Sequence, residues 1–555
     1  MDNAKITTHS TAQRRQYRAS GFWQDKTIFQ IVQAHAERTP ERFAVRDRYR
    51  RLAYRQLVEA AECLARDLAE NGIEPGQRLA VWLPNRLETV VTLLACSRNR
   101  YVCCPSFHRN HTVVEVMKLL ERFHIAALVT EKGYGAGADR SNIEAELAGL
   151  PLAPEYYGLQ AFGEEDAGAP PFDHLLGTRT RGDRAGQADP DPDSVVYLAL
   201  TSGTTGEPKG VMHSDNTLLA NSRAIAADWH FDATSVIYTL SPLSHNLGFG
   251  AMVTALYAGA EIVLSHRSPG ESLVDELLRA KATFIYGVPA HAVDLLRELR
   301  KPGARVPENI TGFRISGAQA PTNVVAELIE YGIKPQTGYG MTEAHSHNYT
   351  LPGDEPQRII GTAGRACPGY EIKIWSLDNP DFEAAVGEIG QIGGKGASLM
   401  LGYFDDETAS ASSFNSDGWF LTGDIGSLDE DGYLHITGRI KDVIIRGGHN
   451  VYPARIEQLA VRHPAVEKAA AIPLADARLG ERVCLVIVPA DGASPDPGQI
   501  LRHLNTEGLS KYDMPEYFAE VEDMPLTPGG KVMKRDLLAL VDSGRLNPKP
   551  LNWQS

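Results

Sequence analysis

The chain has 555 residues, of which 43% are hydrophobic and 23% are charged. This length exceeds a single hydrophobic core and predicts several domain-sized units, and the composition excludes a largely disordered protein. The 70 acidic residues outnumber the 55 basic ones, so the net charge of -15 excludes a general electrostatic attraction to nucleic acid or to an anionic membrane.

Helical patterns and short apolar runs alternate from about residue 27 to 130, as in an α/β layered domain. These patterns and runs lie at Phe29 to Val32, 57–68, 79–83 and 90–94. A stretch rich in Gly, Pro, Asp and Arg at about 162–194 is expected to be an exposed connection. Beyond it, strands are predicted at 194–200, 236–240, 261–264, 283–286 and 313–316.

The pattern of the sequence changes near residue 361. Short β-like pieces separated by Gly and Asp predict a β-rich subdomain up to about residue 438. The last hundred residues or so predict a small α+β unit, and the polar segment 438–442 before it predicts a connection between domains. Its strands are expected at 443–445, 469–472 and 483–488, and its helices at 453–463 and 498–503.

The six cysteines are sparse and lack the spacing of a zinc site, which predicts a reduced, cytoplasmic protein. The first twenty residues are polar, and no apolar run reaches about 18 residues. We therefore expect neither a classical secretory signal nor a membrane span.

Residues 201–210, with the sequence TSGTTGEPKG, are the most informative segment. Small residues let backbone N–H groups approach an anion, hydroxyls donate hydrogen bonds, and Lys209 adds positive charge. The segment follows the predicted strand at 194–200, where α/β proteins bind ligands. It is not the ordinary P-loop, because Lys209 lies three residues after Gly206 and is followed by Gly210. The segment predicts a nucleotide phosphate site, and a flexible surface loop is the alternative.

Four further segments accompany this loop: GYGMTE at 338–343, GWFLTGD at 418–424, GRIKDVIIRGGH at 438–449 and PLTPGGK at 525–531. In this order and spacing, the five segments resemble the adenylate-forming superfamily of acyl-CoA synthetases, luciferases and peptide-synthetase adenylation domains. The similarity runs from about residue 27 to 538. The texture, including residues 17–23, is most similar to ligases for medium-chain fatty acids and cyclohexanecarboxylate, which implies a role in fatty acid metabolism.

The resemblance implies a fold of the α/β class with a large, multilayered N-terminal domain. This domain would hold two α/β sheets and a β-rich subdomain within residues 1–438. A hinge would follow at 439–442, with Lys441 at the hinge position, and a small, mobile α+β C-terminal domain would occupy residues 443–555.

The implied activity has two steps: ATP and a carboxylic acid give an acyl-adenylate and pyrophosphate, and the acyl group then passes to a thiol. Negative charge must be offset in the first step, because an anionic carboxylate attacks an anionic phosphate. Lys531 would approach both groups, although a solvated surface lysine is the alternative. Glu343 would bind Mg²⁺, with Thr342 beside the α-phosphate. The β- and γ-phosphates would be held by Thr201, Ser202, Gly203, Thr204, Thr205 and Lys209.

The same resemblance implies which residues bind the adenosine of ATP. Asp424 would accept hydrogen bonds from the ribose hydroxyls, with Arg439 as a second contact, unless Asp424 only caps a turn. Tyr339, next to Gly340, would stack near the adenine, unless it is a core or rim residue. The backbone on the other side of the base would come from Gly317, Ala318 and Gln319.

The second step needs a rearranged site. Rotation at the hinge would withdraw Lys531 and bring Gly447 and Gly448 inward, where missing side chains leave room for the pantetheine arm of CoA. His245 falls where the family places an aromatic gate to the thiol channel, and a buried structural histidine is the alternative.

Only about twenty residues follow Lys534, so we expect no fused carrier domain and free CoA as the acceptor. An enzyme that loads a separate carrier protein and a noncatalytic nucleotide-binding homologue are the alternatives. The expected acyl pocket favours a medium-chain, alicyclic or aromatic acid, while its two histidines leave a hydroxyl or a second carboxylate open. Its lining would be Phe249, Met252, Tyr286, Val288 and Ala318, next to His345 and His347. The oligomeric state is left open, with a homodimer as one option.

Overall fold

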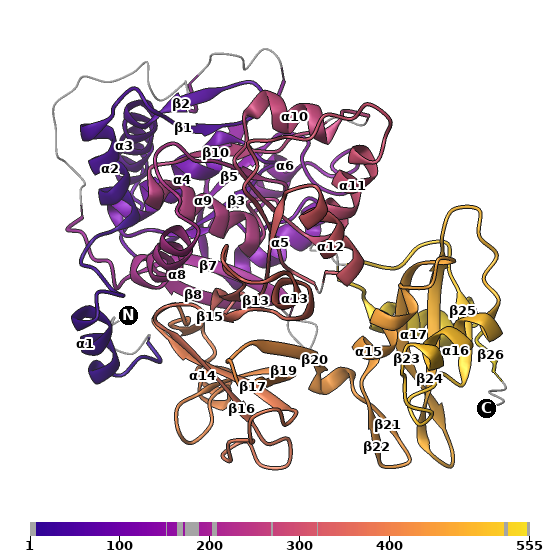
Figure 1. The fold of residues 1–555 in the computed structure, drawn as a ribbon. Helices are drawn as coiled ribbons and strands as arrows, with labels where there is room; N and C mark the ends of the chain where they lie inside the picture. Colours follow the sequence, from indigo (N-terminus) through magenta and orange to yellow (C-terminus); the bar gives the residue numbers. More distant parts are fainter. Residues whose placement is uncertain are drawn as a thin grey trace.

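A computed structural model describes residues 7–150, 152–163, 170–172, 188–202, 208–267, 270–318, 320–526 and 531–551. Figure 1 shows a large N-terminal body, a smaller β-sheet subdomain below it, and a C-terminal unit to one side. The expected mixed α/β class, with a large N-terminal part and a small C-terminal unit, is confirmed.

A seven-stranded sheet carries the glycine-rich segment. Its order is β18 (Gly402–Tyr403), β8 (Pro208–Ser214), β7 (Val195–Ser202), β4 (Val102–Cys104), β3 (Arg78–Trp82), β5 (Ile125–Glu131) and β6 (Glu155–Leu159). The strands from β7 to β6 run parallel, whereas β8 returns antiparallel beside β7. The glycine-rich segment therefore connects two antiparallel strands of one sheet, instead of leading from a strand into a helix.

A nine-stranded sheet forms the other half of the N-terminal body. Its order is β15 (Arg365–Ala366), β14 (His345–Tyr349), β13 (Lys334–Met341), β12 (Gly312–Ile315), β11 (Phe284–Gly287), β9 (Val236–Thr239), β10 (Glu261–Leu264), β1 (Phe43–Arg46) and β2 (Arg51–Ala53). The run from β13 to β1 is parallel. The strands predicted at 236–240, 261–264, 283–286 and 313–316 correspond to β9 to β12.

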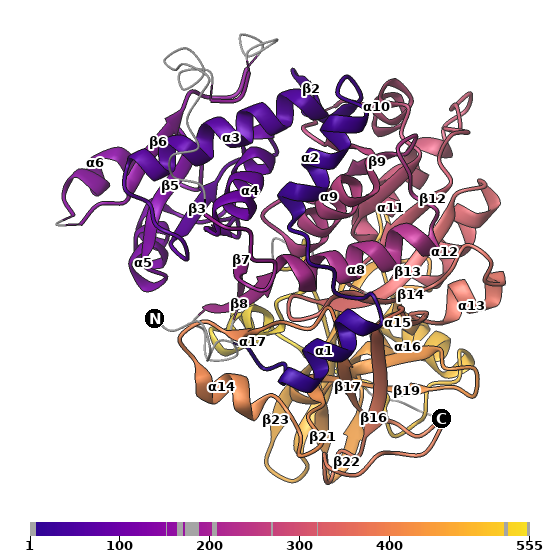
Figure 2. The same cartoon turned by 90° about the vertical axis from the view of Figure 1, so that its left-hand side faces the viewer.

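Helices between and outside these two sheets give a layered body (Figure 2). One core joins the facing sides of both sheets with α2 (Ile28–Arg38), α3 (Tyr54–Glu70), α4 (Leu87–Asn99), α8 (Asp215–Asp228) and α9 (Asn246–Ala258). The outer side of the seven-stranded sheet packs on α5 (Val113–Arg122) and α6 (Ile143–Ala148). The outer side of the nine-stranded sheet packs on α10 (Leu273–Ala280), α11 (Pro289–Leu299) and α12 (Thr322–Glu330). Parallel strands bury both faces in this way.

The β-rich subdomain is a four-stranded antiparallel sheet in the order β16 (Tyr370–Trp375), β17 (Gly390–Gly396), β19 (Phe420–Leu428) and β20 (Leu434–Arg439). The short helix α13 (Pro356–Gly361) packs on α12 and β13, α14 (Glu407–Ser412) packs on β18, and α1 (Thr11–Ala19) lies near the N-terminus. The expectation of short β pieces between about 361 and 438 is confirmed.

The C-terminal unit follows a single 3₁₀ turn, η3 (Ile440–Asp442), and has its own cores. Its sheet has the order β22 (His449–Val451), β21 (Ile444–Arg446), β24 (Gly480–Pro489), β25 (Tyr517–Glu520) and β26 (Lys549–Pro550), with β23 (Val466–Asp476) also paired to β24. Its helices are α15 (Pro453–Ala460), α16 (Pro497–Thr506) and α17 (Lys534–Asp542). All five elements expected from the sequence are present, whereas β22, β25, β26 and α17 were not predicted.

The apolar run at 90–94 lies inside α4, which is buried on nearly all sides. Such a helix loses the polar face that gives helical periodicity, so only its length separates it from a strand. The predicted connection at about 162–194 lies largely outside the described residues. Within the described parts of the chain, no helix is both long and apolar enough to span a membrane.

Candidate active site

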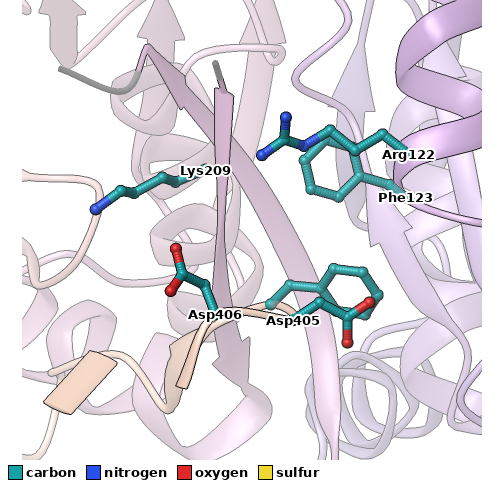
Figure 3. A pocket seen from close by; sticks show the side chains of 6 residues that line it. Arg122, Phe123, Lys209, Asp405 and Asp406 are labelled. Carbon is teal, nitrogen blue, oxygen red and sulfur yellow. The ribbon is translucent and has the colours of Figure 1, made fainter. Parts of the chain in front are cut away.

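The β7–β8 hairpin places the C-terminal end of the glycine-rich segment beside β18. Thr201 pairs with Lys209 across the hairpin. The Lys209 ammonium lies 4.6 Å from the centre of the Tyr403 ring, within cation–π range. Figure 3 shows the small pocket that Lys209 borders, with the lysine side chain extending away from Asp405. The side chain of Ser202 and residues Gly203, Thr204 and Thr205 lie outside the described residues.

Tyr403 links Lys209 to the predicted metal ligand. Its hydroxyl donates a hydrogen bond of 2.9 Å to Oε1 of Glu343, on the turn between β13 and β14. The backbone N–H of Met400, just before β18, donates a hydrogen bond of 2.7 Å to the carbonyl oxygen of Glu343. This bond holds the turn between β13 and β14 next to β18. Burial raises the pKa of Glu343. Lys209 and Glu343 therefore lie on two sides of one tyrosine.

Asp424 is held from two directions. Tyr339 donates its hydroxyl to Oδ2 at 2.5 Å, and Nε of Arg439 lies 2.8 Å from Oδ1. Asp424 and Arg439 are also paired residues of β19 and β20. Asp424 is only 6% exposed and lies in β19, next to a register irregularity between Ile425 and Gly426. Tyr339 is buried, and the edge of its ring contacts His347 at a centroid distance of 5.0 Å.

Lys531 joins these groups from the C-terminal unit. Its ammonium lies within electrostatic range of Asp424, Glu343 and Arg439, and also of Lys441 in η3. The surrounding protein, followed by the charge of Arg439, lowers the pKa of Lys531, while the two carboxylates oppose this effect. The side chain still reaches solvent. Val532, the residue after Lys531, forms an antiparallel β-bridge with Leu526.

Comparisons with known proteins agree with this grouping. Residues 32–404 match the family model described as "AMP-binding enzyme", and residues 455–531 match "AMP-binding enzyme C-terminal domain". The chain belongs to the AMP-binding enzyme family. It is an adenylate-forming acid–thiol ligase, the group in which acyl-CoA synthetases fall.

Two relatives and one solved structure illustrate the similarity. The medium-chain fatty-acid–CoA ligase of Escherichia coli (strain K12) is 31% identical over 542 residues, which cover 96% of this chain and 94% of the relative. The indoleacetate–CoA ligase of Aromatoleum aromaticum is 32% identical over 517 residues, with 92% and 97% covered. The structure of ATP-bound MatB from Rhodopseudomonas palustris has a TM-score of 0.81 at 27% identity, with 93% and 100% covered.

The glycines around Tyr339 are required by close backbone contacts in the ligase. A Cβ at Gly340 would lie 2.3 Å from the carbonyl oxygen of His345, and one at Gly338 would lie 2.5 Å from that of Asn348. No side chain fits at either place without moving β14. Thr342, next along the chain, is anchored because Nε2 of the His213 ring donates to its carbonyl at 2.8 Å.

Gly340→Ala is therefore expected to destabilise the ligase by about 2 kcal/mol and to reduce adenylation, because the new methyl group overlaps the β14 backbone. The thermal unfolding midpoint and acid-dependent ATP–pyrophosphate exchange would be measured. Gly353→Ala is the matched control, since a Cβ there meets nothing within 4 Å. Equal midpoints for the two variants would contradict the packing argument.

Gly317 and Ala318 leave the sheet at the same edge as Tyr339. Ile315 pairs with Thr337 in the parallel β12–β13 register, so the chain after each strand emerges side by side. Gly317 has a φ of 93°, which favours glycine, and Ala318 is exposed. Gln319 lies outside the described residues.

His245 stands at the N-terminus of α9 and stacks on His108, with ring centres 4.3 Å apart. Burial, followed by the neighbouring His111, lowers the pKa of His245 to about 4. The ring is therefore neutral near pH 7, as a purely steric gate requires. Asn246, the next residue, donates to the carbonyl of Met341 at 3.3 Å, which ties the start of α9 to the end of β13.

Gly447 and Gly448 form the exposed turn of the β21–β22 hairpin, with φ of 60° and 85°. In this arrangement Lys531 of the C-terminal unit lies within electrostatic range of Asp424 and Glu343. Arg446 beside the turn pairs with Glu516 at 2.7 Å.

The predicted acyl-pocket residues fall on α9, β11 and β14, apart from Val288 at the start of α11 and Ala318 in the loop after β12. Phe249, Met252 and Tyr286 are buried, and Phe249 stacks on Tyr197 at 3.9 Å. His345 and His347 are also buried, and burial lowers the pKa of His347 to about 3. Val288 is half-buried.

Sequence reasoning missed Tyr403, His213 and Asn246. Each acts through a contact with a residue far along the chain, and none belongs to a segment whose composition stands out. No signal in the sequence alone would have singled them out.

Proposed function

We propose that this ligase joins a medium-chain, alicyclic or aromatic carboxylic acid to CoA through an acyl-adenylate. The observation that carries the proposal is the convergence of Lys531 with Glu343 and Asp424, three residues from separate segments. The large N-terminal domain of residues 1–438, the hinge at 439–442 and the C-terminal domain of residues 443–555 each supply part of this site.

In the first step, a carboxylate oxygen forms a bond to the α-phosphorus of ATP, and the bond from that phosphorus to pyrophosphate breaks. Lys531 offsets the charge of the attacking carboxylate and of the bridging oxygen. Thr342 lies beside the α-phosphate. Lys209 and the hydroxyl and N–H groups of residues 201–205 hold the β- and γ-phosphates.

Glu343 fits a magnesium ligand, because the Tyr403 hydrogen bond orients its carboxylate and a carboxylate offers about four lone-pair sites. Mg²⁺ is usually held by one or two carboxylates together with substrate phosphates, and it would screen their charge here. Among the described residues, no group of three or more His, Cys, Asp or Glu side chains is arranged for a metal.

Asp424 binds the ribose diol in the proposal. A carboxylate has about four lone-pair sites, and Tyr339 and Arg439 occupy two, so two remain for hydroxyls. Arg439 and Tyr339 hold the carboxylate in a fixed orientation before ATP arrives, which reduces the ordering cost of binding. The adenine lies between Tyr339 with Gly340 and the backbone of residues 317–319.

In the second step, the thiol loses its proton to solvent, its sulfur forms a bond to the acyl carbon, and the bond from that carbon to the phosphate oxygen of AMP breaks. Rotation at Lys441 withdraws Lys531 and brings Gly447 and Gly448 to the cleft, where they leave space for the pantetheine arm. The neutral His245 ring moves to open the thiol channel.

The acid class follows from the lining, since Phe249, Met252 and Tyr286 offer mostly apolar surface. The relatives named for medium-chain fatty acids and indoleacetate support an acid of this size. The proposed location is the cytoplasm.

ATP–pyrophosphate exchange over a panel of carboxylic acids, followed by CoA consumption, tests the proposal. Exchange that depends on one acid class and is followed by thioester formation is expected. Exchange without CoA consumption would indicate a carrier-protein acceptor, and the absence of exchange with every acid of the panel would indicate a noncatalytic nucleotide-binding protein.

Tyr403→Phe is expected to reduce the adenylation rate about tenfold or more, because a hydrogen bond to a charged group contributes about 1.5–3 kcal/mol. The ring beside Lys209 is kept. Pyrophosphate exchange at saturating acid would be measured. Tyr157→Phe removes a comparable hydrogen bond to Asp67, far from the site, and serves as the control. Equal rates in the two variants would contradict the role of Tyr403.

A further inference from the structure

A buried positive charge lies next to the residues predicted to line the acyl pocket. Arg314 of β12 is 0% exposed, and none of the described residues offers a hydrogen-bond partner to Nε, Nη1 or Nη2. Gln336 of β13 is also 0% exposed, and both polar atoms of its amide lack a partner in the described part of the chain. We call Tyr286, Arg314, Gln336, His347 and Tyr349 the Arg314 cluster.

The sheet register places this cluster on the side of the acyl pocket. Tyr286, Arg314 and Gln336 are successive partners across the parallel strands β11, β12 and β13, so their side chains share one face. That face is the one covered by α8 and α9, because Tyr286 packs with them while Ile285 and Ile315 pack on the opposite side. Phe249 and Met252 of the proposed acyl pocket are on α9.

The chain makes room for the guanidinium. A Cβ at residue 338 would lie 2.6 Å from Nη1 of Arg314, so Gly338 leaves space where a side chain would collide. The Arg314 guanidinium carbon lies 5.5 Å from the centre of the Tyr349 ring. The Tyr349 hydroxyl donates to Asp228 at 2.8 Å, which engages the carboxylate there.

This arrangement is electrostatically incomplete. Burial lowers the pKa of Arg314 to about 10, so the group stays charged at neutral pH. Removing an unpaired ion from water costs several kcal/mol, and one cation–π contact offsets only about 2 kcal/mol of it. The two neighbouring histidines, His345 and His347, are neutral because burial lowers their pKa values. The complement that the cluster lacks is therefore an anion, and a planar guanidinium matches a carboxylate.

The distance from the nucleotide suits a second carboxylate of the same substrate. Arg314 of β12 precedes Gly317, in the loop after that strand, by three residues, and Gln336 precedes Tyr339 by three residues on β13. At roughly 3.3 Å per strand residue, the cluster lies about 10 Å from the edge where the adenylate forms. A mid-sized diacid reaches across this span.

We propose that the acid activated by this ligase carries a second carboxylate, which Arg314 and Gln336 bind at the closed end of the acyl pocket. This inference rests on the proposed function and narrows its acid to a medium-length or ring-bearing dicarboxylic acid. The distal carboxylate takes no part in bond making, so it leaves unchanged in the thioester. It pairs the Arg314 charge and fills the hydrogen-bonding capacity of the Gln336 amide.

Matched acids test the proposal in the full-length protein. The value of kcat/KM would be compared for suberate against octanoate, and for cyclohexane-1,4-dicarboxylate against cyclohexanecarboxylate. We expect the diacid of each pair to be favoured about tenfold or more, because the monoacid leaves the buried polar groups unpaired. A preference for the monoacid in both pairs would overturn the inference while leaving the proposed function intact. Failure of every acid would instead overturn the proposed function.

The variant Arg314→Met tests whether Arg314 causes the preference for the diacid. We expect the ratio of diacid to monoacid kcat/KM to fall about 100-fold, since truncating one partner of a buried charge pair costs about 2–5 kcal/mol. Gln336→Leu should lower the same ratio about tenfold. Arg297→Met, at an exposed arginine of α11, is the control and should leave the ratio unchanged. An unchanged ratio in Arg314→Met would contradict the assignment.

A ligand-induced thermal shift protects the test against a variant that fails to fold. In the wild-type protein with AMP, suberate is expected to raise the unfolding midpoint more than octanoate at equal concentration, because the diacid binds more tightly to the folded state. An equal or smaller shift with suberate would overturn the inference.

Discussion

Lys531→Ala is expected to suppress acyl-adenylate formation by about 10²- to 10³-fold, the effect of removing one preorganised charge from a transition state. Thioester formation from a preformed acyl-adenylate should change far less, because the proposed hinge rotation withdraws Lys531 before the thiol reacts. Acid-dependent pyrophosphate exchange would report the first step, and CoA consumption from synthetic acyl-adenylate the second.

Lys511→Ala is the control for this variant, since Lys511 is an exposed lysine of the same C-terminal unit. Both half-reactions should survive in it. An equal loss of the two steps in Lys531→Ala would contradict the two-conformation mechanism.

The pH dependence of adenylation gives a second view of the same lysine. The protonated ammonium is the active form, and its surroundings lower the pKa of Lys531 from the ordinary lysine value of 10.5. The rate of adenylation should therefore be highest below this lowered pKa and should decline as the pH rises through it. Lys531→Arg, whose guanidinium stays charged, should keep its remaining activity to higher pH. If the wild type and Lys531→Arg lose activity over the same alkaline pH range, the decline belongs to a group other than Lys531.

Asp424→Ala is expected to raise the KM for ATP by about 10- to 100-fold, because hydrogen bonds to a charged group contribute about 1.5–3 kcal/mol each. The change removes the ribose acceptor and also leaves Tyr339 and Arg439 without their shared partner. Steady-state adenylation over a range of ATP concentrations would measure it.

A modified nucleotide separates ribose binding from a general loss of structure. The wild-type protein should discriminate strongly against 2′,3′-dideoxy-ATP, which lacks both ribose hydroxyls, whereas Asp424→Ala should use the two nucleotides almost equally. Tyr339→Phe keeps the carboxylate and should retain most of the discrimination. If Asp424→Ala discriminates as strongly as the wild type, Asp424 does not bind the ribose.

The fold was predictable where local pattern and burial agree. The parallel strands β9 to β12 are short apolar runs between turn signals, and the structure places them close to their expected bounds. The segment 90–94 lies in a helix buried on nearly all sides, where periodicity carries no information about the exposed face. The strands β22, β25 and β26 are short and gain their stability from neighbours that are distant in sequence.

The candidate site divides in the same way. Glu343, Asp424 and Lys531 lie in glycine-containing motifs whose composition is visible in the sequence, and the structure brings them together. Tyr403 and Arg314 lie in ordinary strand segments. Their importance comes from one long-range hydrogen bond in the first case, and from burial without an ionic partner in the second, which only three-dimensional packing reveals.

A crystal structure of the protein with a nonhydrolysable acyl-adenylate analogue tests the central claim most directly. The account predicts the ribose hydroxyls on Asp424, the phosphate mimic between Thr342 and Lys531, and the acyl group between α9 and the strands β11 to β13. An analogue bound away from Asp424 and Lys531 would contradict the account.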